Sequence, residues 1–156
     1  MPAPKINSKA PIFKGECTGG KIAHLSKLKG KKVVLYFYPK DDTPGCTRQA
    51  CSYRDHVSDF HNIGARIYGI SLDGLGEHAA FREKYGLSFP LLVDVADGLC
   101  SALGVYKQQE WNGKKYMGLD RDTFLVDPDG KIARVWRSVN PDTTMSETLA
   151  EIKKHQ

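Results

Sequence analysis

Two cysteines lie five residues apart in the segment KDDTPGCTRQACSYRD, residues 40–55. A thiol attacks as its thiolate, so surroundings that favour the anion make a cysteine nucleophilic. Thr43 suits a helix N-cap and Pro44 the first helical position, which places Cys46 in the first turn of a predicted helix. There an anion faces unpaired backbone N–H groups and the positive end of the helix dipole. We therefore interpret Cys46 as a candidate nucleophile.

A second interpretation of Cys46 is a small core residue at the start of a helix, because unreactive cysteines are often buried. Pro44 makes the entry to the helix rigid, and Gly45 has no side chain that would shield the sulfur. Together with the N-cap signal, the second thiol at Cys51 favours the nucleophile.

The spacing of the two thiols limits what they can do together. Five residues along an α-helix advance ~7.5 Å and leave two side chains ~140° apart around the axis. A disulfide needs Cα atoms within roughly 7 Å and converging Cβ vectors. Cys46 and Cys51 therefore cannot bond while the helix is intact. A sulfenic acid at Cys46 would condense with a second thiol once the first turns unwind.

A regular C-x4-C-x4-H-x4-H series resembles a set of zinc ligands. Its members are Cys46, Cys51, His56 and His61. Each step turns the side chain by another ~140°, so the four groups spread around the helix and do not converge on a tetrahedral ion. No metal site is predicted, and both histidines are expected to face solvent.

The elements around Cys46 follow from hydrophobic patterns. The apolar run Val33–Tyr38 predicts a strand buried on both faces, which Pro39 ends. The apolar positions that follow recur at steps of four and three, as on one face of a helix. They are Cys46, Ala50, Tyr53, Val57 and Phe60.

The rest of the chain alternates strand and helix patterns. Further strands are predicted at 66–71, 89–94, 123–126 and 131–137, helices at 78–85, 98–105 and 141–155, and a small β-hairpin between 11 and 28. This order predicts an α/β fold, a mixed central β-sheet with flanking helices and an N-terminal β-hairpin. With 156 residues and 40% hydrophobic composition, we expect residues 1–156 to form a single domain.

Composition narrows the class of protein. The longest apolar run is far shorter than the ~20 residues of a membrane-spanning helix, so no membrane association is expected. The N-terminal residues lack the apolar region of a secretory signal, and a cytoplasmic location is the expectation. Four cysteines are too few for a disulfide scaffold. The net charge is +5, but the sequence lacks the dense basic face expected of a nucleic-acid binder, so no nucleic-acid binding is expected.

Several segments of the sequence resemble those of a known family. The segment YPKDDTPGCT at 38–47, followed by Ala50-Cys51 and Arg54-Asp55, closely resembles the active-site segment of peroxiredoxins of the peroxiredoxin Q type, also called bacterioferritin comigratory proteins. Further matches are GIS at 69–71, FPLL at 89–92, and Arg121 just before TFLVD at 123–127. Together these matches span most of the chain.

The resemblance implies a thioredoxin-like fold and the reduction of hydrogen peroxide and organic hydroperoxides without a metal or organic cofactor. It implies that Cys46 is the peroxidatic cysteine and Cys51 the resolving one, which form an intramolecular disulfide. The implied electron donor is thioredoxin or a glutaredoxin-like protein, and the implied role is antioxidant defence.

The resemblance also implies a substrate site around the thiol. Thr43 and Arg121 would complete the peroxide-binding site, and Pro39, Pro44 and Gly45 would line and shield it. A guanidinium is a fixed cation with several donors, which suits it to hold a thiolate and orient both peroxide oxygens. The Thr43 hydroxyl is expected either to cap the helix or to contact the peroxide.

Several assignments stay open at the level of sequence. Without the resemblance, Arg121 is a surface charge before a strand, and Arg48 and Arg54 compete for the role beside Cys46. Cys100 fits either a helix core or an alternative resolving thiol.

Three further residues are given no catalytic role. Cys17, in the predicted hairpin, is expected to be a bystander. Trp111 and Tyr116 flank a predicted polar loop, where they line substrate or cover core.

Two other functions remain in competition with a peroxidase. A general thiol–disulfide oxidoreductase would be expected to carry C-x-x-C, which this sequence lacks. A redox sensor would transmit unfolding of residues 46–51 to a partner instead of turning over. Because a tight interface over the helix would oppose its unfolding, we expect a monomer.

Overall fold

The computed structural model describes residues 5–11, 14–19, 21–24 and 28–154. Its strands are β1 (Lys14–Cys17), β2 (Lys21–His24), β3 (Lys32–Phe37), β4 (Ala65–Ser71), β5 (Leu91–Val93), β6 (Tyr106–Trp111), β7 (Lys114–Leu119), β8 (Thr123–Val126) and β9 (Ile132–Trp136). Its helices are α1 (Pro44–Arg54), α2 (Val57–Asn62), α3 (Leu75–Tyr85), α4 (Leu99–Ala102) and α5 (Thr144–Lys154).

The described strands form one large mixed sheet and a separate hairpin. The sheet has the order β2-β1-β5-β4-β3-β8-β9. Strand β3 lies in its interior, parallel to β4 and antiparallel to β8. The chain reaches β4 from β3 through α1 and α2, as a parallel connection requires. The predicted mixed sheet and N-terminal hairpin are confirmed.

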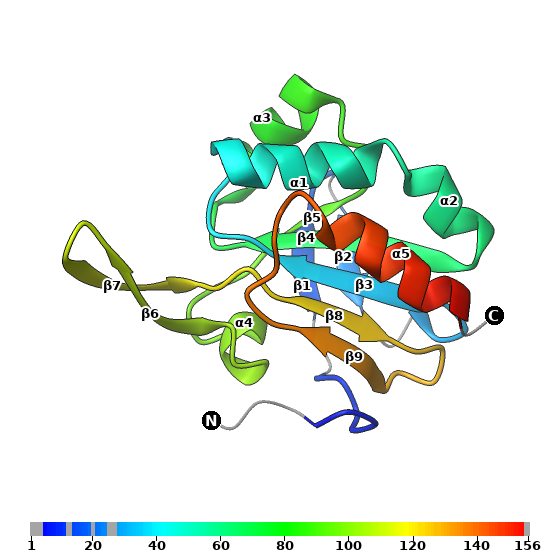
Figure 1. The fold of residues 1–156 in the computed structure, drawn as a ribbon. Helices are drawn as coiled ribbons and strands as arrows, with labels where there is room; N and C mark the ends of the chain where they lie inside the picture. Colours follow the sequence, from blue (N-terminus) through cyan, green and yellow to red (C-terminus); the bar gives the residue numbers. More distant parts are fainter. Residues whose placement is uncertain (1–4, 12–13, 20, 25–27, 155–156) are drawn as a thin grey trace.

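The two faces of the sheet carry separate apolar clusters. Successive side chains of a strand point to opposite faces, and in β3 Leu35 and Phe37 belong to one cluster while Val34 and Tyr36 belong to the other. Helices α1, α2, α3 and α5 contribute to the second cluster, and they lie above the sheet in Figure 1. The first cluster receives α4 instead.

The predicted helix through residue 60 is wrong in one respect, because it breaks after Arg54 and resumes at Val57. The imidazole Nδ1 of His56 hydrogen-bonds the Ser52 carbonyl at 3.0 Å. That carbonyl would accept the His56 backbone N–H in a continuous helix. The N–H instead donates to the Tyr53 carbonyl at 3.1 Å, and the turn tightens.

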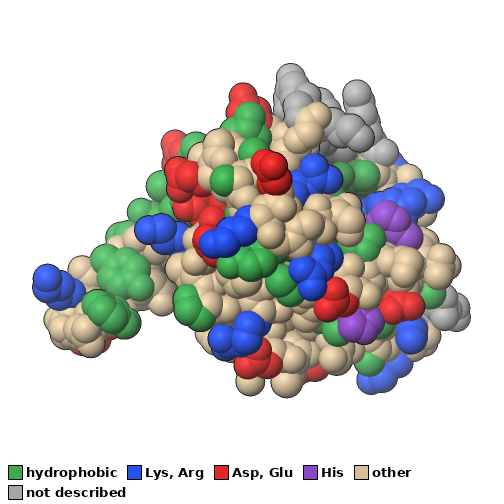
Figure 2. All heavy atoms as spheres, turned by 90° about the horizontal axis from the view of Figure 1, so that it is seen from above, with side chains coloured by type: hydrophobic (Ala, Val, Ile, Leu, Met, Phe, Trp, Pro, Cys, Tyr) green, Lys and Arg blue, Asp and Glu red, His purple; other side chains and the backbone are tan. Residues whose placement is uncertain are grey.

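The polar loop predicted between Trp111 and Tyr116 is also wrong, because β6 and β7 form a hairpin there. Asn112 and Gly113 connect the strands with φ values of 51° and 77°. Asn-Gly with positive φ at both positions is the turn chemistry of a tight hairpin, and it was visible in the sequence. Figures 1 and 2 show the hairpin projecting from the body of the molecule.

The other predicted elements are confirmed with shifted ends. Strand β5 begins only after Pro90, which has no N–H to donate. Helix α4 covers only the first half of its predicted range. Part of the predicted N-terminal hairpin and the last predicted residue of the C-terminal helix lie outside the described residues. Within the described ranges, no helix is both long and apolar enough to cross a bilayer.

Candidate active site

Cys46 lies in the first turn of α1, on its buried face. Thr43 is the N-cap with an extended backbone, and Pro44 opens the helix, so the predicted position of the cysteine is confirmed. The first helical hydrogen bond runs from Thr47 N–H to the Thr43 carbonyl at 2.8 Å. The N–H groups before Thr47 have no helical acceptor, so they and the helix dipole favour an anion at this end. Only 2% of Cys46 is exposed to solvent.

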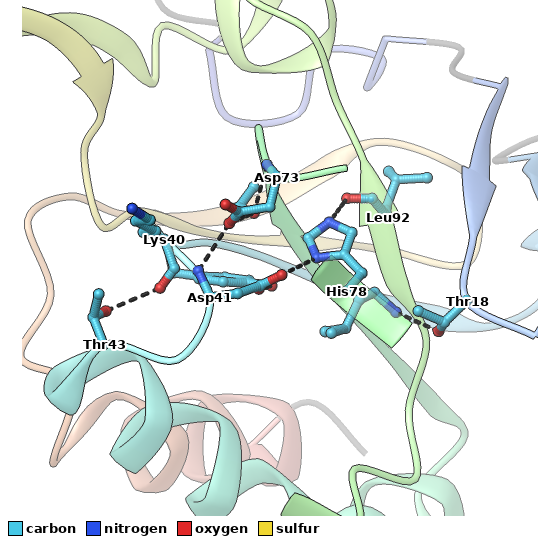
Figure 3. Close-up of polar contacts among 10 residues, drawn as sticks. Thr18, Lys40, Asp41, Thr43, Asp73, His78 and Leu92 are labelled. Atoms are coloured by element: carbon cyan, nitrogen blue, oxygen red, sulfur yellow. Dashed lines mark hydrogen bonds and ion pairs between the residues drawn. The ribbon is translucent and has the colours of Figure 1, made fainter. Parts of the chain in front are cut away.

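The Thr43 hydroxyl does not cap the helix. It donates to the carbonyl of Lys40 at 2.9 Å, within the turn that leads into α1 (Figure 3). Of the two roles expected for the Thr43 hydroxyl, helix capping is therefore not observed. Because a hydroxyl oxygen also has acceptor lone pairs, Thr43 is still able to accept a hydrogen bond from a hydroperoxide.

Arg121 is the cation beside the thiol. Its Nη2 donates to Cys46 Sγ at 3.4 Å, and its Nη1 donates to Gln49 Oε1 at 2.7 Å. The contact joins residues 75 positions apart in the sequence. The competing arginines are engaged elsewhere: Arg48 pairs with Asp142, and Arg54 binds Asp55 and the Tyr85 carbonyl.

Strand pairing and a buried carboxylate hold Arg121 in place. The neighbouring residue Asp122 is fully buried, pairs with Arg137 Nη1 at 2.8 Å and accepts the Ser138 N–H at 2.9 Å. The Asp122 carbonyl accepts the Phe37 N–H of β3 at 2.8 Å. Sequence reasoning missed Asp122 because none of these partners is near it along the chain.

Gln49 is the second partner of Arg121, although it is not among the predicted site residues. It lies three positions after Cys46, on the same face of α1, and it is completely buried. Its Oε1 accepts from Arg121, whereas its Nε2 has no hydrogen-bond partner among the described residues. Helical spacing from Cys46 was the available signal.

Gly45 keeps space beside the guanidinium. A Cβ built on Gly45 would lie 3.4 Å from Arg121 Nη2 and 3.6 Å from Pro141 Cγ. A larger residue would therefore crowd the cation that contacts the sulfur. Pro39 and Pro44 both lie at the surface, on either side of the turn that precedes Cys46.

Cys51 lies in the same unbroken helix as Cys46 and is half-buried. The intact helix therefore keeps the two thiols on separate sides, as their spacing predicts.

Cys17 and Cys100 lie on the other side of the sheet from Cys46, since they belong to the opposite apolar cluster. Burial, followed by the nearby Asp94 carboxylate, raises the pKa of Cys100 to about 12. Cys100 is therefore a thiol at neutral pH and is separated from Cys46 by the sheet.

The structure does not bring Cys46, Cys51, His56 and His61 together as a metal site. Among the described residues, a different group of potential metal ligands does lie close together, namely Asp41, Asp73 and His78. Asp41 belongs to the turn that precedes α1, and Asp73 and His78 lie next to it (Figure 3).

Residues 6–135 match the AhpC/TSA family. Peroxiredoxin Bcp of Bacillus subtilis is 43% identical over 149 residues, which cover 96% of this chain and 95% of that protein. A putative peroxiredoxin bcp of Coxiella burnetii is 44% identical over 148 residues, 95% of this chain and 98% of that protein. The chain belongs to the AhpC/TSA family. Within it, this peroxiredoxin is of the Q or Bcp type, as its active-site segment predicts.

Solved structures of peroxiredoxins have the same fold. A mutant of PrxQ from Xylella fastidiosa superposes with a TM-score of 0.91 at 31% identity, covering 97% of this chain and 96% of that one. The bacterioferritin comigratory protein of Xanthomonas campestris, studied for alkyl peroxide reduction, gives 0.86 at 36% identity, covering 92% and 91%. The thioredoxin-like fold is confirmed, and this peroxiredoxin is a thiol peroxidase.

Proposed function

We propose that the chain reduces hydrogen peroxide and organic hydroperoxides with Cys46 as the peroxidatic cysteine and Cys51 as the resolving one. The observation that supports this most directly is the 3.4 Å contact between Arg121 Nη2 and Cys46 Sγ at the start of α1. A fixed cation and the helix N-terminus both stabilise the attacking thiolate and the charge that develops on the peroxide oxygens.

In the first step the Cys46 thiolate attacks one peroxide oxygen and the O–O bond breaks. The sulfur becomes a sulfenic acid, and the other oxygen leaves as an alcohol or water after it takes a proton. In this proposal the Arg121 guanidinium, which contacts the sulfur, and the Thr43 hydroxyl orient the two peroxide oxygens. We expect Pro39, Pro44 and Gly45 to line and shield the approach to the sulfur, since both prolines are exposed beside the turn and Gly45 leaves space beside Arg121.

In the second step the first turns of α1 unwind and the Cys51 thiol attacks the sulfenic sulfur. A disulfide forms and one water leaves. Unwinding is required because Cys46 and Cys51 belong to one helix and point in different directions. Thioredoxin or a glutaredoxin-like dithiol then reduces the disulfide by thiol–disulfide exchange and is itself oxidised.

The test compares wild type, Cys46→Ser and Cys51→Ser for peroxide consumption with thioredoxin recycling, together with mass mapping of disulfides. We expect Cys46→Ser to lose turnover. We expect Cys51→Ser to oxidise once without thioredoxin-dependent recycling. Full turnover by Cys46→Ser would refute the nucleophile, and a Cys46–Cys100 disulfide in wild type would refute the resolving role of Cys51. Oxidation without sustained turnover would favour a redox sensor.

We also propose that the protein acts as a monomer in the cytoplasm. Unwinding of α1 is easiest where no subunit interface covers it, and Pro44 and Arg48 of this helix are exposed. A reducing compartment returns all four cysteines to thiols between turnovers. Light scattering of the reduced and oxidised protein tests the first point, and cell fractionation tests the second.

A further inference from the structure

A buried polar cluster connects the turn before α1 to β4, α3 and β5. We call it the Asp41 cluster; its members are Tyr38, Asp41, Ser71, Asp73 and His78. Asp41 Oδ1 accepts the Tyr38 hydroxyl, and Asp41 N–H donates to Asp73 Oδ2 at 2.8 Å. Asp73 Oδ2 also accepts the Ser71 hydroxyl at 2.7 Å. Figure 3 shows His78 from α3 pointing at Asp41.

The hydrogen bonds of His78 determine where its hydrogens lie. His78 is completely buried, with Nε2 3.0 Å from the Leu92 carbonyl oxygen and Nδ1 2.7 Å from Asp41 Oδ2. A carbonyl oxygen only accepts, so Nε2 carries a hydrogen. The contact at Nδ1 then requires one more hydrogen, on Nδ1 or on the Asp41 carboxyl. The pair therefore holds one proton more than a neutral imidazole beside a carboxylate.

The charges around the pair are consistent with this extra proton. Asp73 and Asp41 are close enough that two bare carboxylates would repel each other. Asp42, Glu77 and Lys84 lie with Asp41 around a neighbouring cavity of about 230 Å³, and Lys84 is already paired with Asp42 at 2.8 Å. A proton on the His78–Asp41 pair offsets the remaining negative charge.

The tyrosines that face the cluster stay uncharged. Burial raises the pKa of Tyr38, and Tyr36 and Asp41 raise it further. Burial also raises the pKa of Tyr36, to which Asp41 adds a smaller effect. The Tyr38 hydroxyl is therefore a hydrogen-bond donor to Asp41 at neutral pH and does not compete for the extra proton.

The cluster is arranged for hydrogen bonds and not for a metal ion. Two zinc ligands at the usual tetrahedral geometry lie roughly 3.3 Å apart, whereas His78 Nδ1 and Asp41 Oδ2 are separated by 2.7 Å. The Asp73 oxygen nearest to them already accepts two hydrogen bonds. A proton fits between His78 and Asp41, and a metal ion does not.

The cluster fixes the segment that ends in the helix N-cap. Asp41 lies two residues before Thr43, and the intervening Asp42 has a φ of 57°, a left-handed backbone that few residue types adopt. Lys84 and Tyr85 of α3 hydrogen-bond the Asp42 carboxylate at 2.8 and 2.7 Å. Helix α3 thus holds two consecutive residues of the turn.

We propose that His78 is a positioning residue for the peroxidase reaction: by holding Asp41, it fixes the turn at 38–43 and so keeps Cys46 in contact with Arg121 while peroxide reacts. This proposal rests on the proposed roles of Cys46 and Cys51. When the first turns of α1 unwind to form the disulfide, the peptide before Thr43 stays in place, because its contacts are to Asp73, which follows β4, and to α3, and not to α1.

Two substitutions at His78 separate the two hydrogen bonds. In His78→Asn the amide nitrogen occupies the position of ring Nδ1 and still donates to Asp41. In His78→Gln the amide nitrogen lies near the position of ring Nε2, so it reaches the Leu92 carbonyl and leaves Asp41 without that donor. Both variants remove the imidazole, and His78→Asn loses the contact to Leu92 instead of the contact to Asp41. Slower oxidation in His78→Gln than in His78→Asn therefore reports the contact to Asp41.

The rate of Cys46 oxidation by peroxide and the rate of disulfide closure are measured separately by stopped flow and quenched mass spectrometry. We expect His78→Gln to oxidise about 10-fold or more slowly, the effect of losing a hydrogen bond to a charged group. Disulfide closure should be no slower, and His78→Asn should oxidise within about 3-fold of wild type.

Three results would overturn the proposal. They are oxidation of His78→Gln at the wild-type rate, equal losses in His78→Asn and His78→Gln, and a loss in His78→Gln that affects both steps by the same factor, as general destabilisation would. Cys46→Ser serves as the separate control. If it still consumes peroxide, the proposed function fails, whatever the His78 variants do.

A measurement on wild type needs no variant to fold. The ¹⁵N chemical shifts of the His78 ring at neutral pH report which nitrogens carry hydrogen. We expect Nε2 to be protonated, with the remaining hydrogen on Nδ1 or shared with Asp41. A ring with no hydrogen on Nε2 would contradict the hydrogen-bond assignment. Binding of one equivalent of zinc by the wild type, if Asp73→Asn abolishes that binding, would also contradict it.

Discussion

Replacement of Arg121 by methionine should slow the oxidation of Cys46 by peroxide more than any loss of stability accounts for. Methionine keeps the length of the side chain but removes the charge and the donor to Cys46 Sγ. It also leaves Gln49 Oε1 without the guanidinium that binds it at 2.7 Å. The fold should survive, because Asp122 and the pairing of β8 with β3 hold the backbone at this point.

The magnitude follows from the contact distance. At 3.4 Å and an effective dielectric constant of about 20, the attraction between a guanidinium and a thiolate is about 5 kcal/mol. Water that enters the space left by Arg121 recovers part of this attraction. Removal of one preorganised donor in comparable anion-stabilising sites costs about 2.7–4 kcal/mol. We therefore expect the second-order rate constant for peroxide to fall by about 10²–10³-fold.

The matched control is Arg48→Met. Arg48 lies on α1, the helix that carries Cys46, but its side chain is exposed and pairs with Asp142 instead of contacting the sulfur. Its removal should change the rate less than about 3-fold, because exposed ion pairs contribute little. Stopped-flow loss of the Cys46 thiol at several peroxide concentrations gives both rate constants, and circular dichroism reports folding. A folded Arg121→Met protein that reacts within about 3-fold of wild type would refute the electrostatic role.

Three further outcomes are expected. At about pH 8, iodoacetamide should label half-buried Cys51 but not native Cys100, whose pKa is raised to about 12; labelling of Cys100 without denaturant would contradict this. Hydrogen bonds from Lys84 and Tyr85 lower the pKa of Asp42, so the stabilisation is present above the usual carboxyl pKa of about 3.9 and lost below the lowered value. Asp42→Asn should therefore reduce Tm at neutral pH but not in strong acid. Gly69→Ala places a Cβ 2.8 Å from two side-chain atoms and should destabilise by about 1–3 kcal/mol in urea titrations; an unchanged midpoint would show that the neighbours move.

Much of the fold was readable from local patterns. The position of Cys46 in α1 follows from Thr43 and Pro44, because N-caps and first-turn prolines act within a few residues. The buried strand β3 follows from one continuous apolar run. Where local prediction was wrong, the cause was a specific contact or an unread turn signal. The His56 side chain interrupts the helix, and Asn-Gly makes the hairpin β6–β7.

The surroundings of the thiol depend on contacts between distant parts of the chain. Nothing near Arg121 in the sequence distinguishes it from Arg48 or Arg54, which lie closer to Cys46 along the chain. The antiparallel pairing of β8 with β3 brings it to the start of α1. The resemblance to known peroxiredoxins named Arg121, but its distance from the sulfur required the tertiary structure.

The sequence by itself therefore determined the candidate reactive element: a cysteine in the first turn of a helix, and a second thiol that only unwinding brings within reach. Those properties depend on helical geometry, which acts between neighbours along the chain. Only the tertiary structure decided which cation contacts the sulfur, which side of the sheet excludes Cys100, and which buried histidine holds the turn before α1. Burial and charge pairing depend on packing across the sheet, and sequence spacing does not report that packing.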